Sequence, residues 1–146
     1  MNIDKLREEL KVDEGVKYEI YLDHLGLPTF GIGHLVLDSD IECGQEVGTP
    51  VSEQRVNECF ASDVNVVCAD CKIIYPAFET LPEEVQLIIA NMMFNMGRPR
   101  LSKFKGMKAG IDSQNWNKAA DEMVDSVWYR QVTSRADRLV NRMRSI

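Results

Sequence analysis

Two carboxylates and a hydroxyl stand close together near the start of the chain, in a segment that also carries glycines. Glu14, Asp23 and Thr29 precede the run Gly31-Ile32-Gly33-His34, and all of them lie within 21 residues. Hydrolysis of a glycosidic bond needs a protonated acid at the leaving oxygen. It also needs a second group that directs water, or stabilises positive charge, on the other face of the sugar. A Glu and an Asp held by short segments have the functional groups for both tasks.

The local patterns indicate how these side chains are presented. Apolar residues at helical spacing over residues 4–12 predict an amphipathic helix with Glu14 at its C-terminus. Polar and apolar residues alternate over 17–23 and again over 29–35, and the segment between them carries glycine and proline. We therefore predict a β-hairpin with Asp23 at its tip.

Each of the three residues also has an ordinary structural interpretation. Glu14 could form a salt bridge at a helix end, Asp23 could form a turn, and Thr29 has good β-propensity. The chain has 23 acidic residues, so a Glu and an Asp nine positions apart carry little information by themselves. The composite pattern of carboxylates, hydroxyl and glycines is more specific than the pair.

The composite pattern is Glu14-x8-Asp23-x5-Thr29, followed by Gly31-x-Gly33-His34. It resembles the bacteriophage lysozyme (endolysin) family of the T-even phage type, which is glycoside hydrolase family 24. Motifs similar to the later helices of this family follow, so the resemblance covers nearly the whole chain. These motifs are Asn91-x-x-Phe94-Asn95-x-Gly97, Leu101-x-Lys103-Phe104, Trp116-x-x-Ala119-Ala120 and Trp128-x-x-Gln131-x-x-x-Arg135-Ala136.

The resemblance implies an α+β, lysozyme-like fold that is mainly helical, with a small β-hairpin lobe, a long inter-lobe helix and an active-site cleft between the lobes. Residues 1–146 then form a single catalytic domain. The expected hairpin lobe covers about 15–50, the inter-lobe helix about 52–72, and the helical lobe about 73–146 plus the N-terminal helix. A length of 146 residues with 45% hydrophobic content suits one domain with a sizeable core.

Helix boundaries can also be read from the sequence. Ser52 is a plausible N-cap for the long helix. Pro82 at a helix start and Gly97 after the last apolar position bound a later helix. A further apolar stripe runs from Trp116 to Val127.

The activity implied by the resemblance is that of a muramidase, a lysozyme that hydrolyses the β-1,4 bond between N-acetylmuramic acid and N-acetylglucosamine in peptidoglycan. In this interpretation Glu14 protonates the glycosidic oxygen, while Asp23 and Thr29 hold a water on the opposite face. The implied outcome is inversion at the anomeric carbon. No metal and no cofactor are expected.

Other site residues are implied by the same residue-by-residue match. Arg135 matches the arginine that pairs with the acid Glu14, and His34 is expected to make a structural ion pair with Asp63. Three residues match positions that contact the sugars, namely Leu35, Phe94 and Asn95.

Several rival functions remain open. A lytic transglycosylase would share the acid and the fold, but it closes an anhydro ring and needs no water held by Asp23 and Thr29. A non-catalytic wall-binding relative would be expected to lose Glu14 or Asp23, and both are present.

Two positions depart from the family pattern. Met107 and Glu122 stand where the T-even type has short polar residues, which leaves the substrate preference open.

The charge of the chain is unevenly distributed. Residues 1–75 have a net charge of −9, whereas residues 76–146 have a net charge of +3. Basic side chains in the second half could favour an anionic wall polymer or nucleic acid, or could be solvated helix faces. An overall charge of −6, without interleaved exposed aromatic residues, argues against a nucleic-acid binder.

Cysteines give no strong site. Cys68 and Cys71 fall within the expected long helix, and Cys43 and Cys59 lack the paired spacing of a zinc ribbon. Free, partly buried thiols are the favoured interpretation in a cytoplasmic protein. A disulfide formed after release, or a metal site, remains an alternative.

The N-terminal residues are charged and lack the apolar core of a secretory signal or membrane anchor. We therefore expect the protein in the host bacterial cytoplasm until release, and in the periplasm and cell wall afterwards. The resemblance implies release through a membrane hole made by a separate holin, and lysis of the host at the end of phage infection. The expected partner is peptidoglycan, bound by a monomer without membrane insertion.

Overall fold

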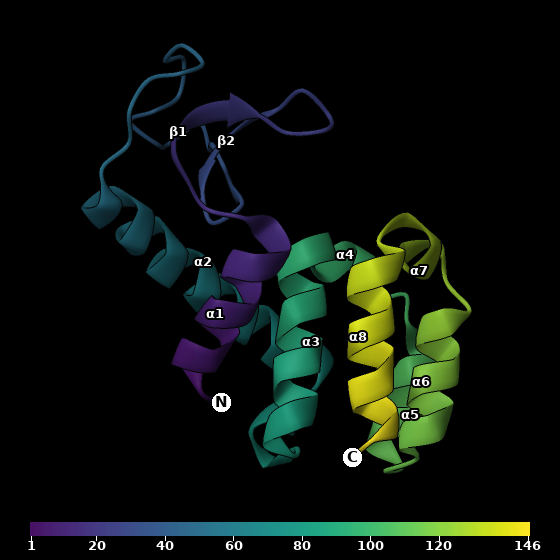
Figure 1. Cartoon of the computed structure of the whole chain (residues 1–146). Helices are drawn as coiled ribbons and strands as arrows, with labels where there is room; N and C mark the ends of the chain where they lie inside the picture. The colour runs from purple at the N-terminus through teal and green to yellow at the C-terminus, as the bar shows by residue number, and fades with distance from the viewer. The chain divides into compact units, whose positions relative to one another are not determined.

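Helices make up most of the computed structural model, which describes residues 1–146 (Figure 1). One long helix, α2, follows the short strands, and a group of shorter helices completes the chain. No helix combines the length and apolarity needed to cross a lipid bilayer. The helices are α1 (Ile3–Glu14), α2 (Glu53–Ile74), the 3₁₀ turn η1 (Phe78–Thr80), α3 (Glu83–Met96), α4 (Arg98–Leu101), α5 (Lys105–Asp112), α6 (Trp116–Val124), α7 (Val127–Gln131) and α8 (Thr133–Arg144).

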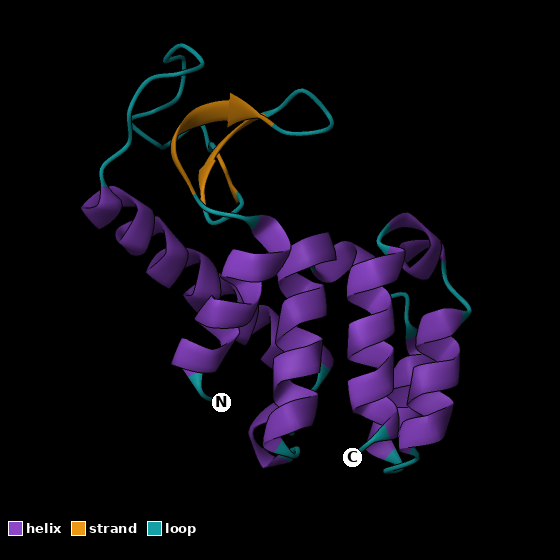
Figure 2. Cartoon of the chain, in the orientation of Figure 1, coloured by secondary structure: helices purple, strands orange, loops and turns teal.

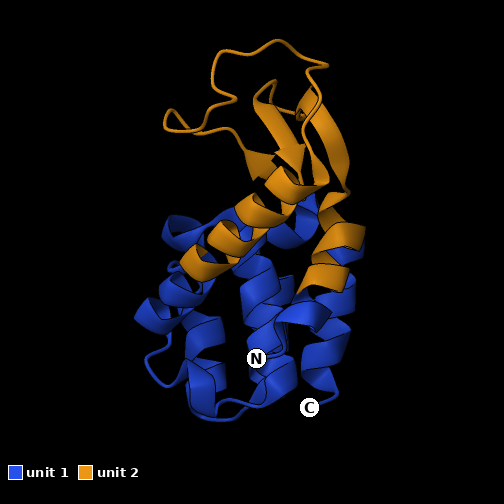
Figure 3. Cartoon of the chain, turned by 90° about the vertical axis from the view of Figure 1, so that its left-hand side faces the viewer, with its two compact units in different colours: residues 1–6, 67–146 blue, residues 7–66 orange.

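The chain divides into two compact units (Figure 3). The sheet unit comprises residues 7–66, and the helical unit comprises residues 1–6 together with 67–146. Helices α1 and α2 each contribute residues to both units.

A three-stranded antiparallel sheet lies in the sheet unit, in the order β1-β2-β3 (Figure 2). The strands are β1 (Lys17–Leu22), β2 (Pro28–Gly31) and β3 (His34–Leu35). The antiparallel pairing of β1 with β2 confirms the predicted hairpin. The alternating segment 29–35, however, does not run as one strand. Gly31 and Gly33 have φ values of +64° and +58°, so the chain reverses between them and forms two strands instead of one. Glycine adopts this left-handed conformation without a steric penalty.

The register of the sheet determines which side chains share a face. Tyr21 and Leu35 lie opposite Thr29 from the two neighbouring strands. Directly opposed residues point to the same face of an antiparallel pair. Tyr21, Thr29 and Leu35 therefore form a row across the sheet.

Apolar side chains of the sheet and of two helices form the core of the sheet unit. Ile20 and Phe30 are almost completely buried, as is Leu10 of α1. On α2, Val56 and Phe60 are also buried. The same strand and helix periods that predict these elements also predict their buried faces.

The core of the helical unit is built around α3, which is apolar on most of its circumference. Helix α8 packs against α3 and α6, and α6 packs against α5 (Figure 1). A helix that is hydrophobic nearly all round is typical of a central position. Its fully or almost fully buried apolar residues are Val85, Leu87, Ile88, Ile89, Ala90, Met92 and Met93.

Most helix boundaries follow the predicted capping signals. The backbone N–H of Arg55 donates to Ser52 Oγ at 3.1 Å, so Ser52 caps α2 as predicted. Pro82 precedes α3, and Gly97, with a φ of +80°, ends it. One boundary differs: Val127 is the first residue of α7 and is 56% exposed, so it does not continue the buried stripe of α6. Ser126 caps α7 by accepting a hydrogen bond from the backbone of Tyr129.

The close packing of α5 on α6 gives a first prediction. A Cβ on Gly110 would lie 2.7 Å from the backbone nitrogen of Ala119 and 3.0 Å from Asn115 O. Neither backbone atom can move without shifting a helix. We expect Gly110→Ala to lower the free energy of unfolding by about 2 kcal/mol, measured by urea denaturation, because overpacking outweighs the gain in helix propensity.

Gly106 on the same helix is the matched control. A Cβ there would meet the carboxylate of Glu122, which is the far end of a flexible side chain. Gly106→Ala should therefore change stability by no more than about 1 kcal/mol. Equal effects of the two substitutions would show that the contact between α5 and α6 does not depend on glycine.

Candidate active site

Glu14 is the last residue of α1, and glycines on both sides shape its surroundings. Gly15, with a φ of +76°, ends the helix and donates its backbone N–H to Lys11 O. A Cβ on Gly33 would lie 2.8 Å from Glu14 Oε2 and 3.1 Å from Glu14 Cβ. The turn between β2 and β3 therefore lies directly against the Glu14 side chain, and only glycine leaves room for it.

Asp23 is fixed by the backbone of its own turn. Its Oδ1 accepts hydrogen bonds from the N–H groups of Leu25 and Leu27 at 2.8 and 2.9 Å. Its own N–H donates to Leu27 O at 2.9 Å. The second carboxylate oxygen, Oδ2, accepts no hydrogen bond. This arrangement is an Asx turn that orients the carboxylate and leaves one oxygen for another ligand.

Thr29 is tied to the same residue. Its Oγ1 donates to Leu27 O at 3.0 Å, and the side chain is buried, with 4% exposure. Since the hydroxyl hydrogen is engaged, the remaining hydrogen-bonding capacity of Oγ1 is its lone pairs. Leu27 therefore orients both the Asp23 carboxylate and the Thr29 hydroxyl, and leaves an acceptor on each.

The phenol of Tyr21 lies near both carboxylates, those of Glu14 and Asp23. The pKa of this phenol is raised above the usual 10.0, first by burial and then by the negative charges of Glu14 and Asp23. Both carboxylates therefore lie within electrostatic reach of one phenol, on the strand residue that lies opposite Thr29. The structure thus gathers the three predicted catalytic residues in the sheet unit, beside the same sheet.

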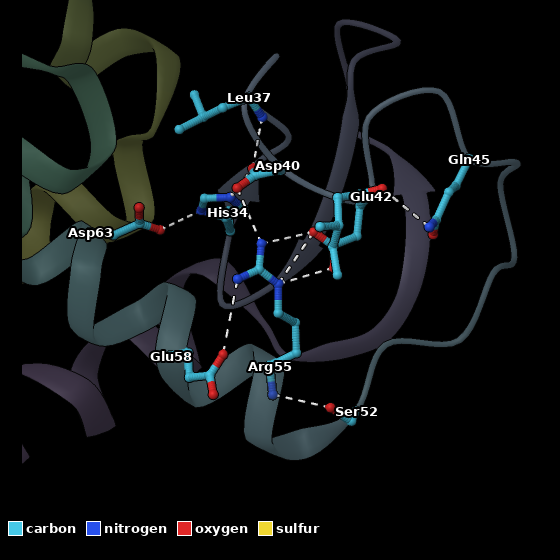
Figure 4. Close-up of polar contacts among 10 residues, drawn as sticks. His34, Leu37, Asp40, Glu42, Gln45, Ser52, Arg55, Glu58 and Asp63 are labelled. Carbon is cyan, nitrogen blue, oxygen red and sulfur yellow. Dashed lines mark hydrogen bonds and ion pairs between the residues drawn. The ribbon is translucent and has the colours of Figure 1, made fainter.

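His34 lies between two carboxylates (Figure 4). Its Nδ1 is 2.7 Å from Asp63 Oδ2, the pairing that the family resemblance implies, and its Nε2 is 2.8 Å from Asp40 Oδ2. An ionised carboxylate only accepts hydrogen bonds, so both ring nitrogens must carry hydrogen. The ring is 6% exposed and is therefore a buried imidazolium.

Arg55 of α2 extends this network. Its guanidinium binds both oxygens of the buried Glu42 carboxylate, with Nε 3.0 Å from Oε2 and a terminal nitrogen 2.9 Å from Oε1. The same terminal nitrogen lies 3.2 Å from Asp40 Oδ1 (Figure 4). Asp40 also accepts the N–H of Leu37 at 2.8 Å. We refer to His34, Asp40, Glu42, Arg55 and Asp63 as the charge network, which ties the loop after β3 to α2.

The pKa values in the charge network follow from these contacts. Burial disfavours the His34 imidazolium, but the hydrogen bonds to Asp63 and Asp40 outweigh it and raise its pKa above 6.5. For Asp40, burial is opposed by the Leu37 N–H and by His34, and the net pKa falls below 3.8. The hydrogen bonds from Arg55 lower the pKa of Glu42 below 4.5. The shifts thus hold His34, Asp40 and Glu42 in their charged forms.

The sequence predicts the partner Asp63 but not the rest of the charge network. Asp40 and Glu42 stand in an irregular loop, where spacing has no period that could relate them to α2. Arg55 is three residues after the helix cap Ser52, so its position on the first turn of α2 could have been inferred. Its partners could not.

Three predicted site residues lie in the helical unit. Asn95 Oδ1 accepts a hydrogen bond from the indole N–H of Trp128 at 2.8 Å. Phe94, beside it on α3, is partly buried. Arg135, 8% exposed, donates from Nε to Asn91 Oδ1 at 2.9 Å.

The remaining predicted sugar contact, Leu35, belongs to the sheet unit and is 46% exposed beside Thr29. The pairing of Arg135 with Glu14 would join the two units and stays a prediction.

The helical unit also contains a pocket of about 530 Å³, which is lined by aromatic, apolar and charged side chains. Its aromatic side chains, Phe104 and Trp128, meet edge to face with ring centroids 6.3 Å apart. Met107 and Glu122, the two positions that depart from the family pattern, both line it. The remaining lining residues are Arg100, Lys103, Lys105, Gly106, Asp125, Ser126, Val127 and Gln131.

Neither the carboxylates nor the cysteines form a recognisable metal centre. No group of three or more His, Cys, Asp and Glu side chains is arranged to hold a metal ion. Cys59 and Cys71 are buried, and burial raises the pKa of their thiols to about 11 and about 12. Cys68 is partly buried, whereas Cys43 is exposed.

Comparison with known proteins places this chain in a family. The chain belongs to the phage lysozyme family, because the model of that family, described as "Phage lysozyme", matches residues 11–145. Membership supports hydrolysis of peptidoglycan of the lysozyme type, which is a glycoside hydrolase activity.

Similar proteins come from a phage and from an amoeba. The pre-baseplate central spike protein Gp5 of Enterobacteria phage T4 is 29% identical over 92% of this chain, which spans only 26% of that protein. Probable T4-type lysozyme 2 of Dictyostelium discoideum is 27% identical over 95% of this chain and 93% of its own length. Probable T4-type lysozyme 1 of the same organism has the same identity and coverage.

The charge network gives a prediction about pH. The raised pKa of His34 means that its contribution to stability is complete below about pH 6.5, the unfolded value, and is lost as the pH rises through the folded pKa. The lowered pKa values of Asp40 and Glu42 have the opposite sign: their contributions are present above pH 3.8 and 4.5 and are lost on acidification. The charge network therefore contributes most to stability between about pH 4.5 and pH 6.5.

We expect His34→Gln to lower the free energy of unfolding by about 3 kcal/mol at pH 5.5, because a buried ion pair loses its cation. The difference from wild type should shrink as the pH rises above 6.5, measured by urea denaturation across the pH range. His24→Gln, at an exposed turn residue, is the control and should change stability by less than about 0.5 kcal/mol. A difference independent of pH would show that His34 is not a buried cation.

Proposed function

We propose that this chain is an endolysin, a muramidase that hydrolyses the β-1,4 bond between N-acetylmuramic acid and N-acetylglucosamine in peptidoglycan. One observation carries the proposal: Leu27 fixes the Asp23 carboxylate and the Thr29 hydroxyl together. Asp23 Oδ2 and the lone pairs of Thr29 Oγ1 are both available to accept hydrogen bonds. Two fixed acceptors are what is required to hold one water molecule by its two hydrogens.

The mechanism assigns each group one step. The water donates one hydrogen to Asp23 and one to Thr29, so a lone pair of its oxygen is directed at the anomeric carbon. Glu14 transfers its proton to the glycosidic oxygen as the bond from that oxygen to the anomeric carbon breaks. The water oxygen forms the new bond to that carbon, and its proton passes to Asp23. Attack opposite the leaving group gives inversion.

Asp23 has a second effect on the reaction. The transition state resembles an oxocarbenium ion, and a fixed carboxylate lowers the energy of that positive charge. The Asx turn holds the carboxylate in place before the substrate arrives. Little reorganisation is therefore needed during the reaction.

A lytic transglycosylase is the alternative enzyme. It also protonates the leaving oxygen, but the sugar's own hydroxyl then closes an anhydro ring, so no water has to be positioned. The paired acceptors on Asp23 and Thr29 favour the hydrolase. A non-catalytic wall-binding protein would need neither group in this orientation.

The proposal extends to the biological role. The protein would accumulate in the host bacterial cytoplasm, cross the membrane through a hole made by a separate holin, and act on the wall as a monomer without a cofactor. Membership of the phage lysozyme family supports the lysozyme-type hydrolysis on which this role depends. Leu35, Phe94 and Asn95 are proposed sugar contacts, and Arg135 is the proposed partner of Glu14.

Loss of the acid should abolish cleavage. We expect Glu14→Gln to lower the rate of clearing of outer-membrane-permeabilised Gram-negative cell walls at least about 10³-fold, because the amide cannot protonate the leaving oxygen. Asp13→Asn, which neutralises the neighbouring acidic residue, is the control. Mass spectrometry of the released muropeptides tests the reaction type: reducing-end products support the muramidase, whereas anhydro products would establish the transglycosylase.

The water-binding pair makes a separate prediction. Thr29→Val keeps the branched shape of the side chain but removes the hydroxyl, and should lower kcat about 10²-fold. Thr29→Ser keeps the hydroxyl and is the matched control, with kcat expected within about tenfold of wild type. If valine and serine were equally active, Thr29 would not hold the water. Urea denaturation of both variants separates a loss of chemistry from a loss of folding.

A further inference from the structure

Tyr21 lies beside all three proposed catalytic residues, although neither the motif nor the mechanism above uses it. It is the cross-strand partner of Thr29, so the two side chains share one face of the sheet. The negative charges of Glu14 and Asp23 both act on its phenol. Glu14, Asp23 and Thr29 therefore all lie near Tyr21 in the sheet unit.

Lys17 contacts the Tyr21 ring. Its ammonium group lies over the aromatic ring, 4.5 Å from the centroid, which is a cation–π contact. Both residues belong to β1, whose register with β2 is irregular between them. The ammonium group therefore covers one face of the ring and favours this orientation of it.

The phenol hydroxyl is a donor without a partner in the protein. Tyr21 is only partly buried, and its hydroxyl makes no hydrogen bond to another residue. Because burial and two nearby carboxylates raise its pKa, the hydroxyl keeps its proton throughout the ordinary pH range. A neutral O–H next to an acid and a bound water can donate to an oxygen atom of a ligand placed between them.

The geometry points to Tyr21 as a further substrate-contacting residue, whose hydroxyl donates a hydrogen bond to an oxygen of the saccharide bound between Glu14 and the Asp23–Thr29 pair. This inference rests on the proposed function, because it requires that the sugar whose bond is cut lies at these residues. A contact to the sugar whose bond is cut can strengthen as that sugar distorts towards the transition state, and a contact of that kind raises kcat. Lys17 acts through Tyr21 and is a positioning residue.

The test is a comparison of Tyr21→Phe with Tyr18→Phe on soluble peptidoglycan oligosaccharides of defined length. Phenylalanine at position 21 keeps the ring and the contact with Lys17 but removes the hydroxyl. We expect kcat to fall about tenfold, the size of effect expected for one hydrogen bond, with KM within about twofold of wild type. Tyr18, exposed on the same strand, should tolerate the same substitution with kcat and KM unchanged.

A second measurement does not depend on turnover. In Glu14→Gln protein labelled with 3-fluorotyrosine, addition of the oligosaccharide should shift the ¹⁹F resonance of Tyr21 and leave that of the buried Tyr75 in place. Tyr21→Phe identifies the resonance by removing it. The inference would be overturned by wild-type kcat in Tyr21→Phe, or by a Tyr21 resonance that does not respond to saturating oligosaccharide.

The two levels of the proposal fail separately. If wild-type protein releases no muropeptides, the proposed function is wrong. If wild type cleaves, Glu14→Gln does not, and Tyr21→Phe equals wild type, the muramidase stands and only the role of Tyr21 is rejected.

Discussion

The sheet unit depends on the ion pairs that the buried His34 imidazolium makes with two carboxylates. Its two ring nitrogens bind carboxylates from different segments, Asp40 in the irregular loop and Asp63 in α2. His34 itself begins β3, next to the residue that pairs with Thr29. A strand of two residues has little stability of its own. The short strand therefore obtains its position from an ion pair, and the candidate active site obtains part of its shape from β3.

Backbone groups do most of the positioning at the candidate active site. Leu27 contributes no side-chain chemistry, yet its N–H and C=O orient both Asp23 and Thr29. Glu14 is placed by the end of a helix and by the absence of a side chain at Gly33. Such positioning is rigid because the backbone has few soft torsions. It also means that the site tolerates changes at Leu27 better than changes in the length of the turn.

Local signals made much of the fold predictable. The cap Ser52, the boundaries Pro82 and Gly97, and the apolar periods of the helices all act over a few residues, and each is confirmed. Alternation over 29–35 does not reveal that this segment forms two strands. Polar and apolar residues continue to alternate through the tight turn, and the positive φ values of its two glycines show where the chain reverses.

The candidate site was predictable in its residues but not in its arrangement. The spacing of Glu14, Asp23 and Thr29 singled them out through a family resemblance, and the structure shows them beside one sheet. Asp40, Glu42 and Arg55 were missed because their contacts join a loop without a period to a helix 13 or more residues away. Tyr21 was missed because a strand tyrosine has an ordinary structural role, and its neighbours depend on the register across the sheet.

The distribution of the thiols has a practical consequence. Cys43 is exposed in the loop between β3 and α2. Cys59 and Cys71 are buried, and their raised pKa values keep them protonated. A thiolate is the reactive form, so a maleimide dye at neutral pH would attach preferentially at Cys43. The native protein thus carries a labelling site directly after Glu42, a member of the charge network. The fluorescence of a dye placed there would be sensitive to the surroundings of the loop, and so to any change that breaks the contacts of Glu42 with Arg55.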